Sequence, residues 1–110
     1  MKRKSNAALR RRRAALVRQL PPLDALLRGS LIERYKRCGK PGCKCADGPG
    51  HGPKFYLSVT PAKGRPQQDY VPLDYHDQVS ELLDNYRTTR QIFEDICEIN
   101  RELLRRRELL

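Results

Sequence analysis

The last third of the chain is predicted to form one long helix. From about Asp74 to Leu110 there is no glycine or proline, and apolar residues recur at heptad spacing. One heptad series contains Val79, Tyr86, Phe93, Asn100 and Arg107, and the other contains Leu82, Thr89, Ile96, Leu103 and Leu110. A continuous helix of this length would extend about 50 Å. Its apolar seam needs a partner surface, because an amphipathic helix is stabilised mainly by burying that face.

The seam could be covered by an N-terminal helix, by a sheet, or by a second molecule. We expect a homodimer or docking on a larger protein through residues 79–110. A single Asn in an otherwise apolar a position can fix the register of parallel dimers, and Asn100 has that place. The alternative is that Asn100 is exposed where the helix leaves the domain. The expected docking residues are Val79, Leu82, Tyr86, Phe93, Ile96, Asn100 and Leu103, and Cys97 beside them is expected to pack as a small hydrophobe.

A second helix is predicted near the N-terminus. Ser5 or Asn6 can cap a helix over residues 7–20, and Pro21 follows it. Its apolar stripe consists of Leu9, Leu16 and Leu20. A further short turn of helix is expected before Gly29.

Between the two helices the pattern predicts three short antiparallel strands. Residues 31–36 alternate loosely, residues 55–60 alternate cleanly, and turn residues at 61–65 precede a third strand over 67–71. The fold class is therefore α+β. Its segments are a basic helix and connector at 1–28, a β domain at 29–72 and the long helix at 73–110. So small a sheet needs a helix or a metal to be stable.

The strongest chemical signal is a Cys-x4-Cys-x-Cys-x5-His cluster between the first two strands. Cys38, Cys43, Cys45 and His51 form the Cys3His set of structural zinc sites, so we expect bound Zn²⁺. Asp47 could replace His51 as the fourth ligand. Disulfides, a reactive thiol and a loop without metal remain alternatives, and a reducing compartment disfavours the first of these.

Charge is distributed unevenly along the chain. The formal net charge is +10, but residues 1–65 hold 17 Lys and Arg against three acids, and residues 66–110 hold six Arg against ten acids. This asymmetry favours a polyanionic partner for the first part, and the alternatives are a merely soluble protein and a solvated basic tail. The residues expected to contact nucleic acid are Arg10, Arg11, Arg12, Arg13, Arg18, Arg34, Lys36, Arg37, Lys40, Lys44 and Lys54.

Aromatic residues stand among the second group of cations. Tyr35, Phe55 and Tyr56 offer stacking surfaces beside those cations, and the sheet core is expected to claim Phe55.

Several classes of protein are disfavoured. There is no phosphate-binding glycine motif and there are only two histidines, so we expect no enzyme. No apolar stretch approaches the roughly 18 residues of a membrane span. A secretory signal is interrupted by arginines, and a mitochondrial presequence fits only loosely, so a cytoplasmic location is expected.

The cluster also carries a family resemblance. Cys-Gly-Lys-Pro-Gly-Cys-Lys-Cys-Ala, then Gly-His-Gly-Pro, then Phe-Tyr-Leu, resembles a family of small bacterial proteins that form a domain of unknown function. The resemblance covers most of residues 25–105. It implies that the Cys and His residues act together, and it assigns no activity. Lys54 stands where the motif leads us to expect an aromatic residue.

These observations predict a small zinc-containing nucleic-acid-binding protein without catalysis, with DNA favoured over RNA. The alternative is a zinc-stapled interaction module or accessory subunit that docks on a larger partner through its long helix.

Overall fold

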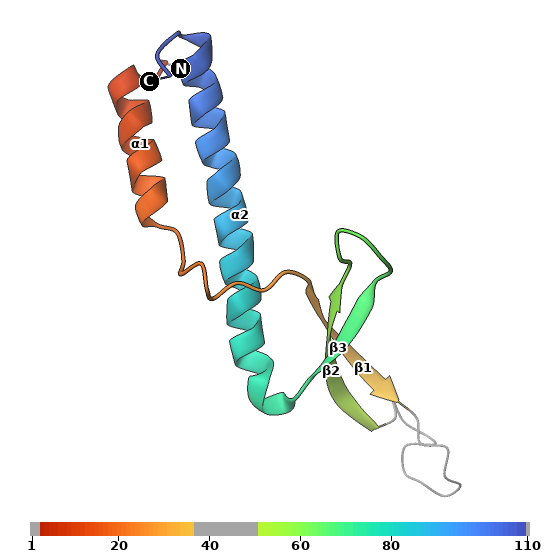
Figure 1. Cartoon of the computed structure of the whole chain (residues 1–110). Helices are drawn as coiled ribbons and strands as arrows, with labels where there is room; N and C mark the ends of the chain where they lie inside the picture. Colours follow the sequence, from red (N-terminus) through yellow and green to blue (C-terminus); the bar gives the residue numbers. More distant parts are fainter. Residues whose placement is uncertain (1–2, 37–50, 110) are drawn as a thin grey trace, which may run out of the picture. The chain divides into compact units, whose positions relative to one another are not determined.

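The computed structural model describes residues 3–36 and 51–109. The elements follow in the order α1 (Asn6–Arg18), β1 (Ser30–Lys36), β2 (His51–Val59), β3 (Gln67–Val71), η2 (Leu73–Tyr75) and α2 (His76–Arg105) (Figure 1). The α+β fold class is confirmed. The chain divides into a helical unit, Met1–Leu26 with Asp84–Leu110, and a sheet unit, Leu27–Leu83. The first and last expected segments thus share one unit, and α2 belongs to both.

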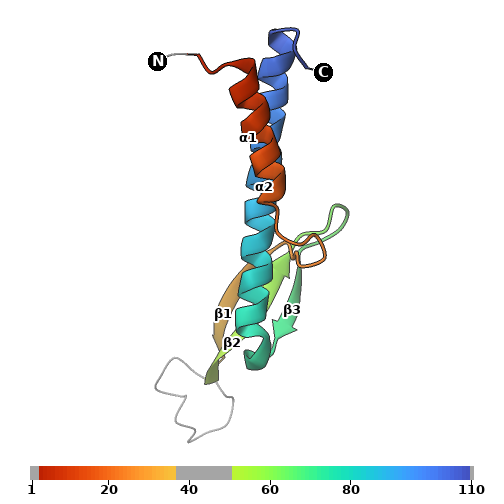
Figure 2. The same ribbon diagram turned by 90° about the vertical axis from the view of Figure 1, so that its left-hand side faces the viewer.

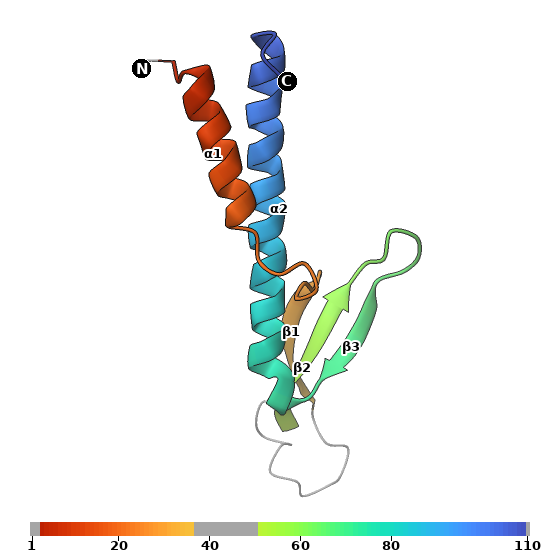
Figure 3. The same cartoon turned by 60° about the vertical axis from the view of Figure 1, so that its left-hand side comes forward.

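The helical unit is an antiparallel pair formed by α1 and the later turns of α2 (Figure 3). The Ser5 hydroxyl caps α1 by accepting a hydrogen bond of 3.1 Å from the Ala8 N–H. The core of this unit contains Leu9, Leu16, Ile92, Ile99 and Leu103, with Leu20 and Ile96 packed against it. Each fully buried Leu or Ile contributes roughly 1.5–3 kcal/mol. The predicted stripe of α1 is therefore the face that holds the pair together.

The buried stripe of α2 includes only part of the predicted seam. Thr89 and Leu103 are buried as expected, but their buried neighbours are Ile92 and Ile99. The predicted a residue Phe93, one position after Ile92, is 51% exposed. Ile92 and Ile99 flank the series of Thr89 and Leu103 on one side of the helix, and Phe93 flanks it on the other. Helix α1 covers only the side of Ile92 and Ile99. The Thr89 hydroxyl is buried with no hydrogen-bond partner among the described residues.

The end of α2 comes earlier than expected, at Arg105. The Glu108 N–H donates to the Leu103 carbonyl at 2.8 Å, and the Arg107 N–H donates to the Leu104 carbonyl at 3.0 Å. Arg107 has a φ of 61°. This is the Schellman pattern, in which a left-handed residue satisfies the last helical carbonyls. Local chain reversal, not loss of apolar periodicity, therefore ends the helix.

The sheet unit contains the three strands in the order β1-β2-β3, all antiparallel (Figure 2). One face of the sheet is covered, because Leu57 and Val71 form a core with Leu83 of α2. Leu27, Leu31, Phe55 and Val79 pack against this core. The covered face thus attaches the first turns of α2 to the sheet.

Strand β2 begins at His51, four residues before the expected start, and runs through Pro53. The pairing with β1 shifts register between Arg34 and Lys36, and the pairing with β3 begins only at Phe55. A proline has no N–H to donate, and bulges are places where a strand tolerates one. The irregular pairing explains how Pro53 fits within the central strand.

The connector between α1 and β1 forms a turn where a short helix was expected. The Ala25 N–H donates to the Pro22 carbonyl at 3.0 Å. The Asn85 side chain donates to the Ala25 carbonyl, also at 3.0 Å. The first bond closes the turn, and the second anchors the connector to α2 within the helical unit.

Candidate nucleic-acid interface

The face of the sheet opposite the core carries a row of three residues, one from each strand. Ile32 pairs with Tyr56, and Tyr56 pairs with Tyr70. Successive side chains of a strand point to opposite faces, and the neighbouring Leu57 and Val71 point into the core. Ile32, Tyr56 and Tyr70 therefore lie together on the other face, which we call the open face.

The two tyrosines of this row contact each other. Their ring centroids are 5.8 Å apart, with planes inclined by 67°, an edge-to-face arrangement. Tyr70 is 58% exposed, whereas Tyr56 is half-buried. The Arg34 guanidinium lies 5.8 Å from the centroid of the Tyr56 ring, within the range of a cation–π contact. Tyr56 is thus held from two sides, and it supports the more exposed ring of Tyr70.

The next pair along the open face consists of two cations. Arg34 and Lys54 are directly opposed across β1 and β2, and both are exposed. Like charges at directly opposed positions destabilise a sheet. An anionic partner that lies across both side chains would relieve this repulsion.

The acids of the three strands lie on the other side of the sheet. Glu33 pairs with Phe55, and Asp69 pairs with Leu57, so both acids share the face of the core residues. Between Ser30 and Arg34 of β1, Lys54 and Val59 of β2, and along β3, the open face has cations but no acids. The sheet therefore separates its charges by face.

The expected aromatic group is divided between the two faces. Phe55 packs against the core, as expected, and its ring lies 4.5 Å from the His76 ring. The Tyr35 hydroxyl donates a hydrogen bond of 2.7 Å to the Glu33 carboxylate. This bond raises the pKa of Tyr35, because ionisation would remove the donor and place two negative charges together. Only Tyr56 of the expected three belongs to the open face.

Tyr70 is the residue that sequence reasoning missed. Its strand was predicted correctly, but the alternation of Gln67–Val71 does not identify the partner of each residue. Register decides that partner, and a slip of one residue would exchange the two faces. The sequence offered one signal: Val71 at the end of the strand is apolar and expected to be buried. Tyr70, its neighbour, therefore lies on the opposite face.

The arginines of α1 do not form one uniform anion-binding surface. Arg10 forms an ion pair with Glu108 at 3.2 Å and also donates to the Glu108 carbonyl at 2.9 Å. Arg13 donates to the Asn100 side chain at 2.6 Å, so Asn100 has a partner within its own chain. These two arginines help to hold α1 against α2.

The remaining arginines of α1 are more exposed. Arg12 is 4.0 Å from Asp95, a weak surface pair. Arg11 and Arg18 are exposed and have no acidic partner among residues 3–36 and 51–109. Their spacing of seven residues places them on one side of α1. This side of α1 remains available to an anion.

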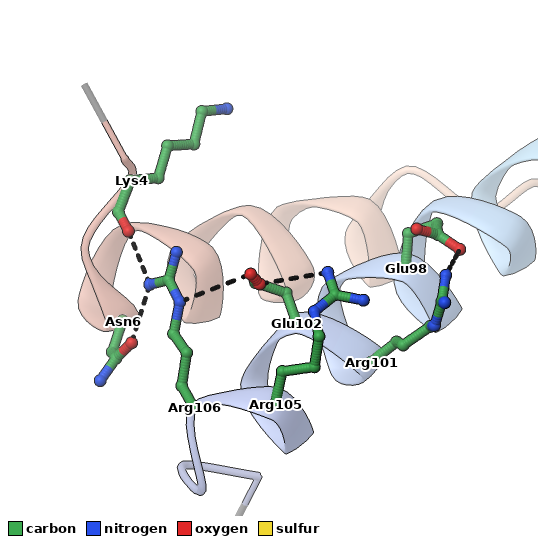
Figure 4. A network of polar contacts seen from close by, with 7 residues as sticks. All are labelled: Lys4, Asn6, Glu98, Arg101, Glu102, Arg105 and Arg106. Atoms are coloured by element: carbon green, nitrogen blue, oxygen red, sulfur yellow. Dashed lines mark hydrogen bonds and ion pairs between the residues drawn. The ribbon is translucent and has the colours of Figure 1, made fainter. Parts of the chain in front are cut away.

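Polar contacts also connect the beginning of α1 with the end of α2 (Figure 4). The Arg106 guanidinium donates to the Lys4 carbonyl at 2.7 Å and to the Asn6 side chain at 2.9 Å. Glu102 accepts a hydrogen bond of 3.2 Å from Arg105, and this bond lowers the pKa of Glu102. Arg105 and Arg106, near the C-terminus, are thus used for structure or local pairing.

Most of the expected zinc cluster lies outside the described residues. This holds for Cys38, Cys43 and Cys45, for the alternative ligand Asp47, and for the neighbouring cations Arg37, Lys40 and Lys44. His51 is the first residue of β2, and its backbone position pairs with Lys36. Within residues 3–36 and 51–109, no group of three or more His, Cys, Asp or Glu residues could hold a metal ion.

The expected docking residues have three different environments. Val79 packs with the core of the sheet unit, whereas Ile96 and Leu103 pack in the helical unit. Leu82, Tyr86 and Asn100 are half-buried. Phe93 is exposed, and so is Cys97, which was expected to be packed.

No described helix is long and apolar enough to cross a membrane.

Comparison with curated proteins and with solved structures finds no match. A family model described as a domain of unknown function, DUF6788, matches residues 6–81. The matched range contains α1, the three strands and the first turn of α2. It starts and ends earlier than the resemblance seen in the sequence, and it includes the Cys and His motif. Because the family model covers more than half of the chain, the chain belongs to the DUF6788 family of unknown function.

Proposed function

We propose that this protein is a small nucleic-acid-binding protein that catalyses no reaction of its own. The observation that carries the proposal is the open face, where Arg34 and Lys54 are opposed beside Tyr56. Cations neutralise phosphates and release their counterions, and an aromatic ring beside them can stack on a base. A cation pair that costs stability in the free protein favours a bound anion.

A structural zinc ion is part of this proposal. The pairing of Lys36 with His51 holds the two ends of the intervening segment at neighbouring points of the sheet. The first expected ligand, Cys38, is two residues beyond Lys36, and the last is His51 itself. A Cys3His set close to a strand end is typical of metal sites that staple a small sheet.

The decisive experiment is a salt titration of binding to a labelled oligonucleotide. The double variant Arg34→Gln/Lys54→Gln removes two charges from the open face. If both side chains contact phosphates, the slope of log K against log salt becomes shallower by about 1.4–1.8. Fluorescence anisotropy between low and moderate salt measures this slope.

The control removes the same charge elsewhere in the sheet unit. Lys63 and Arg65 are exposed in the turn between β2 and β3. The double variant Lys63→Gln/Arg65→Gln should leave most of the slope in place. Equal losses in the two double variants would show that only net charge matters, and absence of salt-dependent binding would contradict the proposal.

A protein-interaction module is the second candidate, and one observation favours it. Phe93 and Leu104 are 51% and 49% exposed and stand eleven positions apart, so they lie on the same side of α2. The exposed Cys97 lies between them on that side. Light scattering tests self-association: a dimer that becomes a monomer in Phe93→Gln would support this candidate, and a monomer at all concentrations would exclude the homodimer.

A further inference from the structure

We infer that the row Ile32–Tyr56–Tyr70 is a stacking platform that selects single-stranded nucleic acid over duplex. This inference rests on the proposed function and identifies its substrate class. The shared ligand chemistry is an unpaired base attached to a phosphodiester backbone, which single-stranded DNA and single-stranded RNA both provide.

The first argument is the shape of the surface. The row crosses three strands, with neighbouring strands about 4.8 Å apart. The major groove of B-DNA is about 12 Å wide and admits a helix or a two-stranded ribbon. The open face of a three-stranded sheet is broader than such a ribbon. Such a face enters the groove less readily than a two-stranded ribbon, so its central residue, Tyr56, is better placed to meet unpaired bases than base edges inside a duplex.

The second argument is the exposure of Tyr70. Its ring is 58% exposed although it lies in a regular strand against the Tyr56 ring. The contact with Tyr56 restricts the motion of this ring, so a base that stacks on it loses less entropy than on a mobile side chain. Base faces are accessible to such a ring only when the base is unpaired or at an end, because a duplex buries them in its own stack.

The third argument is the place of the cations. Arg34 and Lys54 lie two residues along their strands from Ile32 and Tyr56, about 7 Å away on the same face. A strand whose phosphates follow these cations can direct its bases to the tyrosines. Sequence-tolerant proteins that bind single strands combine these two features: a basic track and aromatic rings beside it.

The test replaces Tyr70 by Leu, which keeps an apolar side chain and removes the aromatic face. Anisotropy is measured with labelled oligothymidine, with oligouridine and with a mixed-sequence duplex at one salt concentration. We expect Tyr70→Leu to weaken binding to both single strands by roughly ten- to hundredfold, the loss of one stacked base. Binding to the duplex should not change, and Tyr70→Phe should restore the single-strand affinity.

The chain offers a matched control and a direct reporter. Tyr75 is 55% exposed in η2 of the same unit, so Tyr75→Leu removes an equally exposed ring away from the open face. The affinity of the Tyr75→Leu variant for both single strands should equal that of the original protein. The chain contains no tryptophan, so Tyr70→Trp places a single indole at the platform. A stacked base should quench its fluorescence, whereas the duplex should not.

The outcomes separate the two proposals. If Tyr70→Leu leaves single-strand binding unchanged while Arg34→Gln/Lys54→Gln still reduces the salt slope, the platform is refuted and nucleic-acid binding stands. Equal affinity for duplex and single strands, without quenching of the indole, also refutes the platform. If no oligonucleotide binds and a protein partner protects the indole instead, both proposals fail.

Discussion

Gly29 joins the connector to β1 at a point where a side chain does not fit. Its φ is 139°, and a Cβ atom would lie 2.7 Å from the Ser58 carbonyl oxygen and 2.9 Å from a methyl group of Leu57. The first neighbour is backbone of the central strand and cannot yield easily. This residue therefore fixes how closely β1 approaches β2.

Replacement of Gly29 by Ala should lower the free energy of unfolding by about 2–4 kcal/mol, through backbone strain and overpacking together. Urea denaturation measures this loss. Gly64→Ala is the control, because Gly64 has a φ of 122° but would place its Cβ more than 4 Å from any neighbour. Gly64→Ala should lose only the free energy due to backbone strain, about 1–3 kcal/mol and less than Gly29→Ala. Equal losses in the two variants would contradict the close approach.

At the scale of the elements, the local sequence pattern predicted the type of each element, helix or strand, better than it predicted which face of that element is buried. The stripe of Leu9 and Leu16 and the boundaries of β3 could be read directly, because period and turn chemistry are properties of the segment. The choice of Ile92 over Phe93 depends on where α1 packs. The place of Tyr70 depends on register with Tyr56. Such choices come from pairing between segments, so one segment's sequence does not contain them.

The expected zinc ligands illustrate the same distinction at the candidate site. The spacing from Cys38 to His51 predicts a metal because ligand chemistry is local. The open face combines residues from three strands that are up to forty positions apart. No linear motif marks that combination, and only the pairing of Ile32, Tyr56 and Tyr70 reveals it.

The C-terminal cap of α2 leads to a prediction about Arg107. An arginine with a φ of 61° carries a strain of about 1 kcal/mol that glycine avoids. Arg107→Gly also removes a cation that interacts favourably with the helix dipole, so Arg107→Ala is needed as the control for charge. We expect the Gly variant to be about 1 kcal/mol more stable than the Ala variant in urea denaturation. A Gly variant no more stable than the Ala variant would contradict the left-handed cap.

At the scale of the whole molecule, the charge of the sequence and the charge open to a partner are different quantities. The net charge of +10 includes Arg10, Arg13 and Arg106, which bind groups on the paired helix. Among the residues that the structure describes, exposed cations are found in both units, and they include Arg11 and Arg18 on α1 and Arg34 and Lys54 on the open face. Part of the positive charge of the sequence is therefore used within the fold and is not open to a partner.

Zinc removal tests the stability of the sheet unit as a whole. Cys43→Ser should reduce the zinc content of the purified protein and lower its melting temperature, because metal binding energy contributes to folding energy. Metal analysis together with a thermal melt provides both measurements.

The control for this prediction is Cys97→Ser. Cys97 is exposed on α2 and is not an expected ligand, so its loss should change neither zinc content nor melting. Unchanged metal content and melting in Cys43→Ser would show that the protein does not hold zinc through this residue.

Helix α2 contributes Val79 and Leu83 to one core and Ile92, Ile99 and Leu103 to the other. Starting a helix is costly, whereas extending an existing one adds a hydrogen bond for each residue fixed. A turn nucleated by either core can therefore propagate through Asp84 into the other. The two units therefore do not need separate helix-nucleation events. Conversely, if one core is lost, the turns of α2 that it held unfold, and this unfolding weakens the part of α2 that belongs to the other core. Folding of the sheet and pairing of the helices thereby become coupled through the amide hydrogen bonds of α2.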